Sequence, residues 1–270
     1  VPHAPLAGVE KLENIVFSAD NAYLRRALRE IRMLSSLSDG RFGVNFEASA
    51  SLTSTISQLR GGTQFIFDLV DQPEGIRLLA EKVADAIIRL QTEVDACVPH
   101  PAQGTCHRWL NYWNPGRGFW FSEDDAIMLS PAMYRDIFLD VDQRLCDSAR
   151  CAVVHWHTAG LHLVDILLNL KGLRMIQLSF DPNGPSLPTV LSVCRRITDA
   201  SVRVCFQMDF DPQTVRAIFS SLPPDACMFY FGYAPDIAAA NKVVREVARL
   251  AHQAKRKSNQ PLRATADSRA

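Results

Sequence analysis

The amino-acid sequence predicts an α/β fold with a mainly parallel sheet. In the second half of the chain, short apolar runs alternate with amphipathic stretches of helical length. We expect strands at 151–156, 174–180, 202–207 and 226–231, and helices at 161–170, 188–197, 212–221 and 236–254. The runs are apolar almost throughout, as is typical of parallel strands covered by helices. Their regular alternation with helices indicates repeated βα units.

The first half predicts further helices and two more strands. Residues 131–150 follow a helical pattern that opens with Ser130 as N-cap and Pro131 in the first turn. Its apolar residues recur at helical spacing on one face. Helices are also expected at 22–37 and 73–96. The two remaining strands are expected at 41–46 and 105–113.

Two segments are predicted to be irregular. The stretch from Trp113 to Ser122 reads as a loop whose aromatic residues either form a lid or pack locally. Residues 255–270 lose their periodicity and become polar, so we expect a disordered tail after a single domain at 1–254.

The composition excludes several classes of partner. The 270 residues include 29 Lys+Arg and 29 Asp+Glu, so no charge excess favours nucleic acid or an anionic membrane. No apolar run approaches the ~20 residues that span a bilayer, and the N-terminus shows no signal-peptide pattern. The seven scattered cysteines contain no Cys-x-x-Cys pair, which fits reduced thiols. We therefore expect a cytoplasmic protein.

The most informative segment is the strand that ends at His155, Trp156 and His157, shortly before Gly160. The two histidines are two residues apart, so they point the same way on an extended chain, while Trp156 points into packing. Catalytic groups of βα-repeat proteins cluster at such carboxyl ends of strands. The spacing also suits two zinc ligands, with His162 as a possible third nitrogen.

Other polar residues stand at or near the remaining strand ends. If the strands close into a barrel, these side chains converge and can bind and protonate a small polar substrate. The set comprises Asn45, Glu47, Asn111, Asp124, Gln177, Asp181, Gln207, Asp209, Tyr230 and Tyr233. Structural alternatives remain open. Asp124, Asp209 and Asp211 fit helix caps, Asp181 fits turn chemistry, and the glutamines and His155 fit roles as hydrogen-bonded core groups.

From about residue 59 to 250 the chain resembles the uroporphyrinogen decarboxylase superfamily, which includes corrinoid- and coenzyme-M-linked methyltransferases. Four motifs in the family's order carry this resemblance. They are Leu59-Arg60-Gly61-Gly62 with 67–74, Asp124 with 129–134, the strand 153–160, and Phe231-Gly232-Tyr233 with 234–241.

The resemblance implies a (β/α)8 TIM barrel with its site at the carboxyl ends of the strands. His157 takes the place of the family's site histidine, and Asp124 takes the place of the aspartate before Ser-Pro. Ala159 and Tyr233 stand where the zinc methyltransferases have two cysteine ligands, which argues against zinc. Only a rearranged site on His155 and His157 would hold the metal.

The decarboxylase branch fits less well. Its arginine-rich N-terminal motif and early aspartate are not found, and the chain begins later than family members do. We therefore expect the barrel to lack an N-terminal segment.

The preferred function is a methyltransferase-like enzyme acting on a small substrate, with a corrinoid protein as a candidate partner. The alternatives are a decarboxylase for a porphyrinogen or other small carboxylate, and a non-catalytic ligand-binding barrel. The expected catalytic residues are His157, Asp124 and Tyr233. The expected substrate-binding residues are His155, Gln177, Asn111, Trp113 and Gln207.

Overall fold

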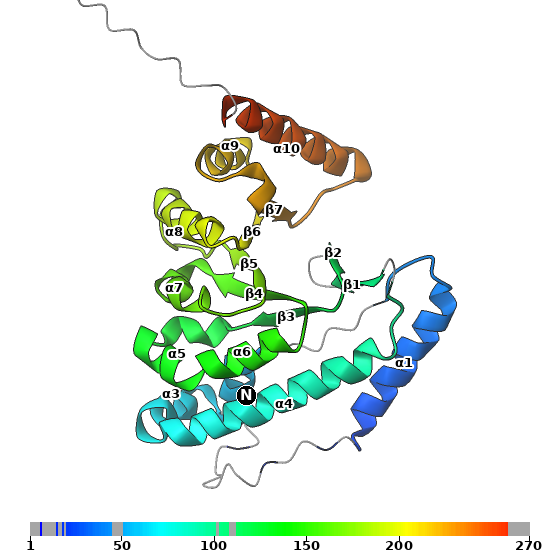
Figure 1. The fold of residues 1–270 in the computed structure, drawn as a ribbon, viewed down its shortest axis with the longest axis vertical. Helices are drawn as coiled ribbons and strands as arrows, with labels where there is room; N and C mark the ends of the chain where they lie inside the picture. Colours follow the sequence, from blue (N-terminus) through cyan, green and yellow to red (C-terminus); the bar gives the residue numbers. More distant parts are fainter. Residues whose placement is uncertain are drawn as a thin grey trace, which may run out of the picture.

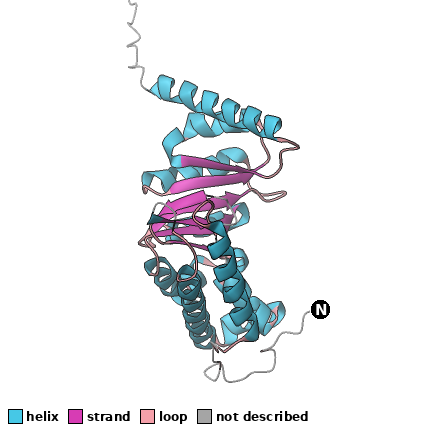
Figure 2. Ribbon diagram, turned by 90° about the vertical axis from the view of Figure 1, so that its right-hand side faces the viewer, coloured by secondary structure: helices cyan, strands magenta, loops and turns pink. Residues whose placement is uncertain are grey.

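The structure, a computed structural model, describes residues 6, 15, 18, 20–44, 51–100, 103–107 and 112–258. Its centre is a five-stranded parallel sheet in the order β3-β4-β5-β6-β7. The strands are β3 Gly118–Ser122, β4 Cys151–His157, β5 Leu173–Ser179, β6 Arg203–Met208 and β7 Cys227–Phe231. The sheet lies between helix α10 (Ile237–Ser258) at one end and the N-terminal helices at the other (Figures 1 and 2).

The predicted βα rhythm of the second half is confirmed. Helices α7 (Val164–Leu167), α8 (Leu187–Asp199) and α9 (Pro212–Ser221) follow β4, β5 and β6 in turn. They lie along one face of the sheet, on the left in Figure 1. Helix α10 follows β7 and packs on α9, where Leu250 meets Val215 and Phe219.

The predicted closed (β/α)8 barrel is wrong for the part of the chain that the structure describes. The parallel sheet is open, with β3 and β7 at its edges. Residues 41–44 form no strand. The strand expected at 105–113 is instead an antiparallel hairpin of β1 (Gly104–His107) and β2 (Tyr112–Pro115). The apolar rhythm predicts βα units, but it does not count the strands or determine whether their sheet closes.

The first half supplies the helices beside β3. They are α1 Ala22–Ser38, α2 Leu52–Arg60, α3 Gly62–Asp71 and α4 Pro73–Asp95. The helix expected at 131–150 is broken at Phe138 into α5 (Pro131–Ile137) and α6 (Leu139–Asp147). Its predicted core face is nevertheless correct, because the apolar residues on both sides of the break are buried. Within the described residues, no helix is long and apolar enough to cross a bilayer.

The two faces of the sheet carry different side chains. Phe119, Phe121 and Trp156 pack into the main core against the helices, whereas Trp120 and Val153 belong to a smaller cluster on the opposite face. All five residues of β3 are buried, so of the two alternatives for its aromatic residues the structure shows local packing. The loop expected from Trp113 to Ser122 is wrong, because β2 and β3 occupy most of it. Helix α10 extends to Ser258, and residues 259–270 of the predicted tail lie outside the described residues. The single-domain organisation at 1–254 stays a prediction.

Candidate functional site

The two histidines at the end of β4 point to the same side of the sheet, as their spacing predicts. Their Nε2 atoms are 3.2 Å apart and their ring planes are nearly perpendicular, at 86°. Asp124 begins a short 3₁₀ helix, Asp124–Met128, directly after the neighbouring strand β3. Its Oδ1 lies 3.5 Å from Nε2 of His155 and 3.8 Å from Nε2 of His157. Adjacent parallel strands therefore bring the three groups together.

The other ring nitrogen of each histidine contacts a hydrogen-bond acceptor. Nδ1 of His155 contacts Oε1 of Gln177, the residue paired with it on β5. Nδ1 of His157 lies 2.6 Å from Oδ1 of Asp181. Because an amide oxygen and a carboxylate only accept, both Nδ1 atoms carry the proton. Both Nε2 lone pairs then face each other across 3.2 Å, an arrangement that a shared cation between them stabilises.

The three inward-facing atoms have the spacing of metal ligands. A triangle with sides of 3.2, 3.5 and 3.8 Å has a circumscribed radius of about 2.0 Å, which matches the Zn–N distance in proteins. Oδ1 of Asp124 is buried and has no hydrogen-bond partner within the described part of the chain. Asp124, His155 and His157 also form a set of potential ligands whose donor atoms all lie within 4.8 Å of one another. Two imidazoles and one carboxylate suit zinc or ferrous iron and leave further coordination positions open.

Electrostatics favours neutral histidine at the buried end of this site. Burial lowers the pKa of His155, against the opposing influence of Gln177 and Asp124. A neutral imidazole is the form that binds a metal. The ring also lies 5.7 Å from that of Trp120, so His155 has packed neighbours that fix its orientation.

Asp181 was among the candidate polar residues, with a turn as its alternative, but the sequence did not predict its contact with His157. Besides His157, its carboxylate accepts hydrogen bonds from the Thr158 hydroxyl and the Ala159 N–H, both at 2.8 Å. Burial acts to raise its pKa, but the hydrogen bonds from His157, Ala159 and Thr158 outweigh it and hold the pKa below the ordinary value. A carboxylate that receives the second N–H of a ligating histidine fixes the ring and raises its basicity.

A hydrogen-bonded chain leads from the histidines to a cavity at the carboxyl ends of β5 and β6. The Gln177 amide donates to Oε1 of Gln207 at 2.7 Å, and Gln207 lines this cavity of about 540 Å³. Phe180, Leu187 and Met208 supply apolar walls, while Asp209 and Gly232 add polar and backbone surface. The volume is typical of a site for a small molecule.

The remaining predicted site residues lie elsewhere. Tyr233 follows Gly232 at the cavity and is 87% exposed, but β7 is three strands away from β4. Trp113 lies on β2 and lines a different cavity.

His162 is not part of the cluster, because its Nε2 bonds to the Leu129 carbonyl. Asn45, Glu47 and Asn111 lie outside the described residues. Asp211 caps α9, as its alternative reading predicts.

Comparison with models of protein families found no match, and comparison with curated proteins found none. Among solved structures, the chain is similar to a methyltransferase from Methanosarcina mazei, with a TM-score of 0.56 and 11% sequence identity. The match covers 93% of this chain and 70% of that chain. At this identity the similarity shows a shared fold.

Proposed function

We propose that this protein is a metal-dependent, methyltransferase-like enzyme in which Asp124, His155 and His157 hold one divalent cation. The observation that carries the proposal is the convergence of two Nε2 atoms and one carboxylate oxygen at metal-ligand spacing. The fold shared with a methyltransferase supports the reaction class. Zinc is the cation we test first, because three protein ligands with an open position are typical of catalytic zinc.

The chain's own residues prepare this site for the metal. Asp181 and Gln177 fix the tautomers of the two histidines, and Asp124 supplies the negative charge. When bound, the cation acts as a Lewis acid that lowers the pKa of a coordinated thiol or hydroxyl. The donor set contains no thiolate, because Ala159 and Tyr233 stand at the family's cysteine positions. The proposed ligands are therefore nitrogen and oxygen atoms, which are harder donors than the thiolates of the zinc methyltransferases that the sequence resembles.

The small substrate occupies the cavity beside Gln207. Tyr233 directly follows Gly232, which lines this cavity, and its phenol is the group we propose to contact a bound substrate or pass a proton to it. The methyl donor is either a corrinoid protein or a small methylated molecule, and it approaches from the carboxyl ends of the strands. His157 and Asp124 act in this reaction through the cation.

Metal binding is the first test. Protein stripped with a chelator is titrated with Zn²⁺ by calorimetry and with Co²⁺ by visible absorption. We expect one ion per chain and no strong thiolate-to-cobalt charge-transfer band, because the ligands carry no sulfur. His157→Ala and Asp124→Ala lose the site, whereas the control variant His252→Ala on α10 retains it. Stoichiometric binding that survives in both site variants contradicts the proposed ligands.

Methyl transfer is tested separately on the zinc-loaded protein. Methylcobalamin serves as donor and 2-mercaptoethanesulfonate or homocysteine as acceptor, with loss of the methylcobalamin spectrum as the readout. Turnover that needs zinc and disappears in His157→Ala supports the proposal. Tight zinc binding without transfer to any thiol or hydroxyl acceptor overturns the reaction class and leaves the metal site in place.

A further inference from the structure

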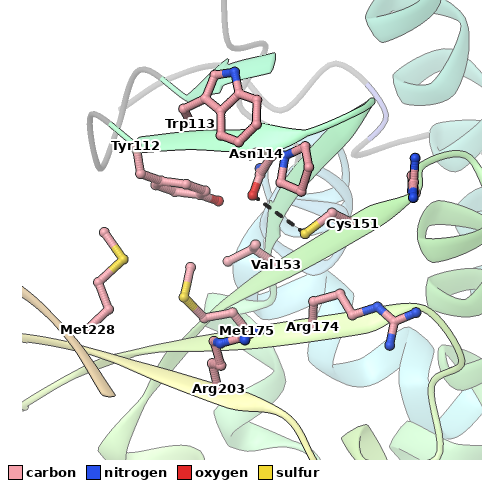
Figure 3. A pocket seen from close by; sticks show the side chains of 11 residues that line it. Tyr112, Trp113, Asn114, Cys151, Val153, Arg174, Met175, Arg203 and Met228 are labelled. Carbon is pink, nitrogen blue, oxygen red and sulfur yellow. Dashed lines mark hydrogen bonds between the residues drawn. The ribbon is translucent and has the colours of Figure 1, made fainter. Parts of the chain in front are cut away.

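A second cavity lies at the opposite ends of the strands, between hairpin strand β2 and the sheet. It measures about 530 Å³. Figure 3 shows Tyr112 and Asn114 of β2 on one side and Val153, Met175 and Met228 of the sheet on the other. The cavity opens beside the first residues of β4, β5 and β6, whereas the histidine cluster stands where β4 ends. It is therefore a separate site, at the amino ends of the strands rather than at their carboxyl ends.

The walls of this second cavity are apolar. Tyr112, Val153, Met175 and Met228 belong to one hydrophobic cluster on this face of the sheet. Trp113 is 46% exposed and adds a large ring at the rim. Aromatic rings and methionine thioethers adapt to flat apolar ligands. The interior therefore suits the apolar body of a small molecule.

The mouth of the second cavity is cationic. Arg150, Arg174 and Arg203 all line it, and none of the three pairs with a carboxylate in the described part of the chain. Arg174 and Arg203 are close enough to Cys151 to act electrostatically on its thiol, opposing the burial that raises its pKa. A guanidinium matches the geometry of a carboxylate or phosphate with two parallel hydrogen bonds.

Asn114 lines the cavity, and one of its buried polar atoms has no hydrogen-bond partner among the described residues. Asn114 is 5% exposed, and its Oδ1 accepts from the Cys151 thiol at 3.5 Å. Its Nδ2 is buried and donates to no atom of the described residues. Leaving such a donor unsatisfied costs about 1–3 kcal/mol.

From these observations we propose that the cavity between β2 and the sheet binds a small amphipathic anion. Its apolar body lies among Tyr112, Met175 and Met228. Its carboxylate or phosphate faces Arg150, Arg174 and Arg203. The proposal is independent of the metal site, since it uses none of the residues around His155 and His157.

The test uses 2-naphthoate, 2-naphthyl phosphate and the neutral 2-naphthylmethanol, titrated by calorimetry into the 270-residue protein with EDTA present. We expect at least one anion to bind about tenfold or more tightly than the alcohol, since hydrogen bonds to charged groups are the stronger ones. The anion that binds more tightly indicates whether the natural ligand carries a carboxylate or a phosphate.

Variants locate the bound probe. The double variant Arg174→Gln, Arg203→Gln removes the preference for the anion and leaves binding of the alcohol unchanged. Met228→Trp fills the cavity and weakens all three probes. The matched control Arg135→Gln, Arg245→Gln removes two exposed arginines from helices α5 and α10 and binds as wild type. The bound anion also slows labelling of Cys151 by N-ethylmaleimide, followed by peptide mass spectrometry.

Three results overturn the proposal. The first is that neither anion binds saturably, and the second is that the alcohol and the anions bind with equal affinity. The third is that an anion binds, but the arginine variant does not weaken its binding and the bound anion does not slow labelling of Cys151. Because the titrations contain EDTA, none of these results depends on the metal or on methyl transfer.

Discussion

Glu123 and Asp124 are consecutive carboxylates at the end of β3 that face opposite sides of the sheet. Asp124 turns towards His155 and His157, and its side chain is 45% exposed. Glu123 is fully buried in the helical layer, where its two oxygens accept hydrogen bonds from the N–H groups of Leu52 and Thr53 at 3.1 and 3.0 Å. Asp124 therefore belongs to the candidate site, whereas Glu123 accepts hydrogen bonds from the first turn of α2. The comparison shows that the face of the strand, rather than the residue type, decides the role.

The surroundings of Glu123 differ from those of Asp124 in charge as well. Burial raises the pKa of Glu123 well above its ordinary value, and the charge of Asp142 raises it further. Burial also raises the pKa of Asp142 to about 7, although the hydrogen bond from the Tyr134 hydroxyl opposes the shift. Glu123 and Asp142 therefore keep protons that exposed carboxylates lose. Asp124, by contrast, faces the two histidines, with its Oδ1 3.5 Å from Nε2 of His155.

Replacing Glu123 has the largest expected effect on stability. Glu123→Ala leaves two buried N–H groups of α2 without an acceptor, which costs about 2–4 kcal/mol in the free energy of unfolding. Urea unfolding measures the loss, and Glu123→Gln, which keeps an acceptor oxygen, is expected to lose much less. If Glu123→Ala unfolds at the wild-type urea concentration, the capping role is wrong.

Asp124→Asn is expected to weaken metal binding and to leave the stability of the metal-free protein almost unchanged. We expect the affinity for Zn²⁺ to fall at least about tenfold, equivalent to 1.4 kcal/mol, because the charged ligand is lost. The unfolding free energy of the metal-free protein should change by less than about 0.5 kcal/mol, since no internal hydrogen bond is removed. Calorimetry and urea unfolding on the same samples separate the two effects. A large loss of stability in the metal-free protein would place Asp124 with Glu123 as a structural residue.

The buried pair also predicts a pH dependence. Asp142 has a pKa of about 7 in the folded protein against 3.8 for its ordinary value, so the folded state binds more protons between these pH values. Its contribution to stability is complete below about pH 4 and is lost as the pH rises through about 7. Asp142→Asn should flatten the fall in stability over this range. Urea titrations of both proteins at pH 4, 5.5, 7 and 8 measure the difference, and parallel curves would show that Asp142 does not titrate here.

Local patterns predicted the elements of the second half and the orientation of the histidines. The strand expected at 151–156 is observed at Cys151–His157, and the helix expected at 212–221 matches α9. These features depend on residues close together in sequence, whose apolar spacing records which side is buried. The same-face placement of His155 and His157 follows from strand geometry alone.

Features that depend on distant residues could not be predicted in this way. Glu123 meets the start of α2 across 70 residues, and Asp181 meets His157 across 24. The Pro-Asn-Gly sequence after Asp181 is a strong turn signal and conceals the histidine contact. The open sheet escaped prediction for a related reason, because strand number and closure are set by pairings that no single strand encodes.

Tyr233→Ala carries the smallest expected effect on metal binding. Tyr233 was predicted as catalytic alongside Asp124, yet it is 87% exposed and follows β7, three strands from β4. Distant sites without shared partners behave independently, so the affinity for Zn²⁺ should change less than about twofold. The zinc-dependent transfer rate should still fall, because Tyr233 directly follows Gly232, which lines the proposed substrate cavity. A weaker metal site in this variant would mean that the loop after β7 closes onto the histidines, and Tyr233 would then join Asp124 as a residue of the metal site.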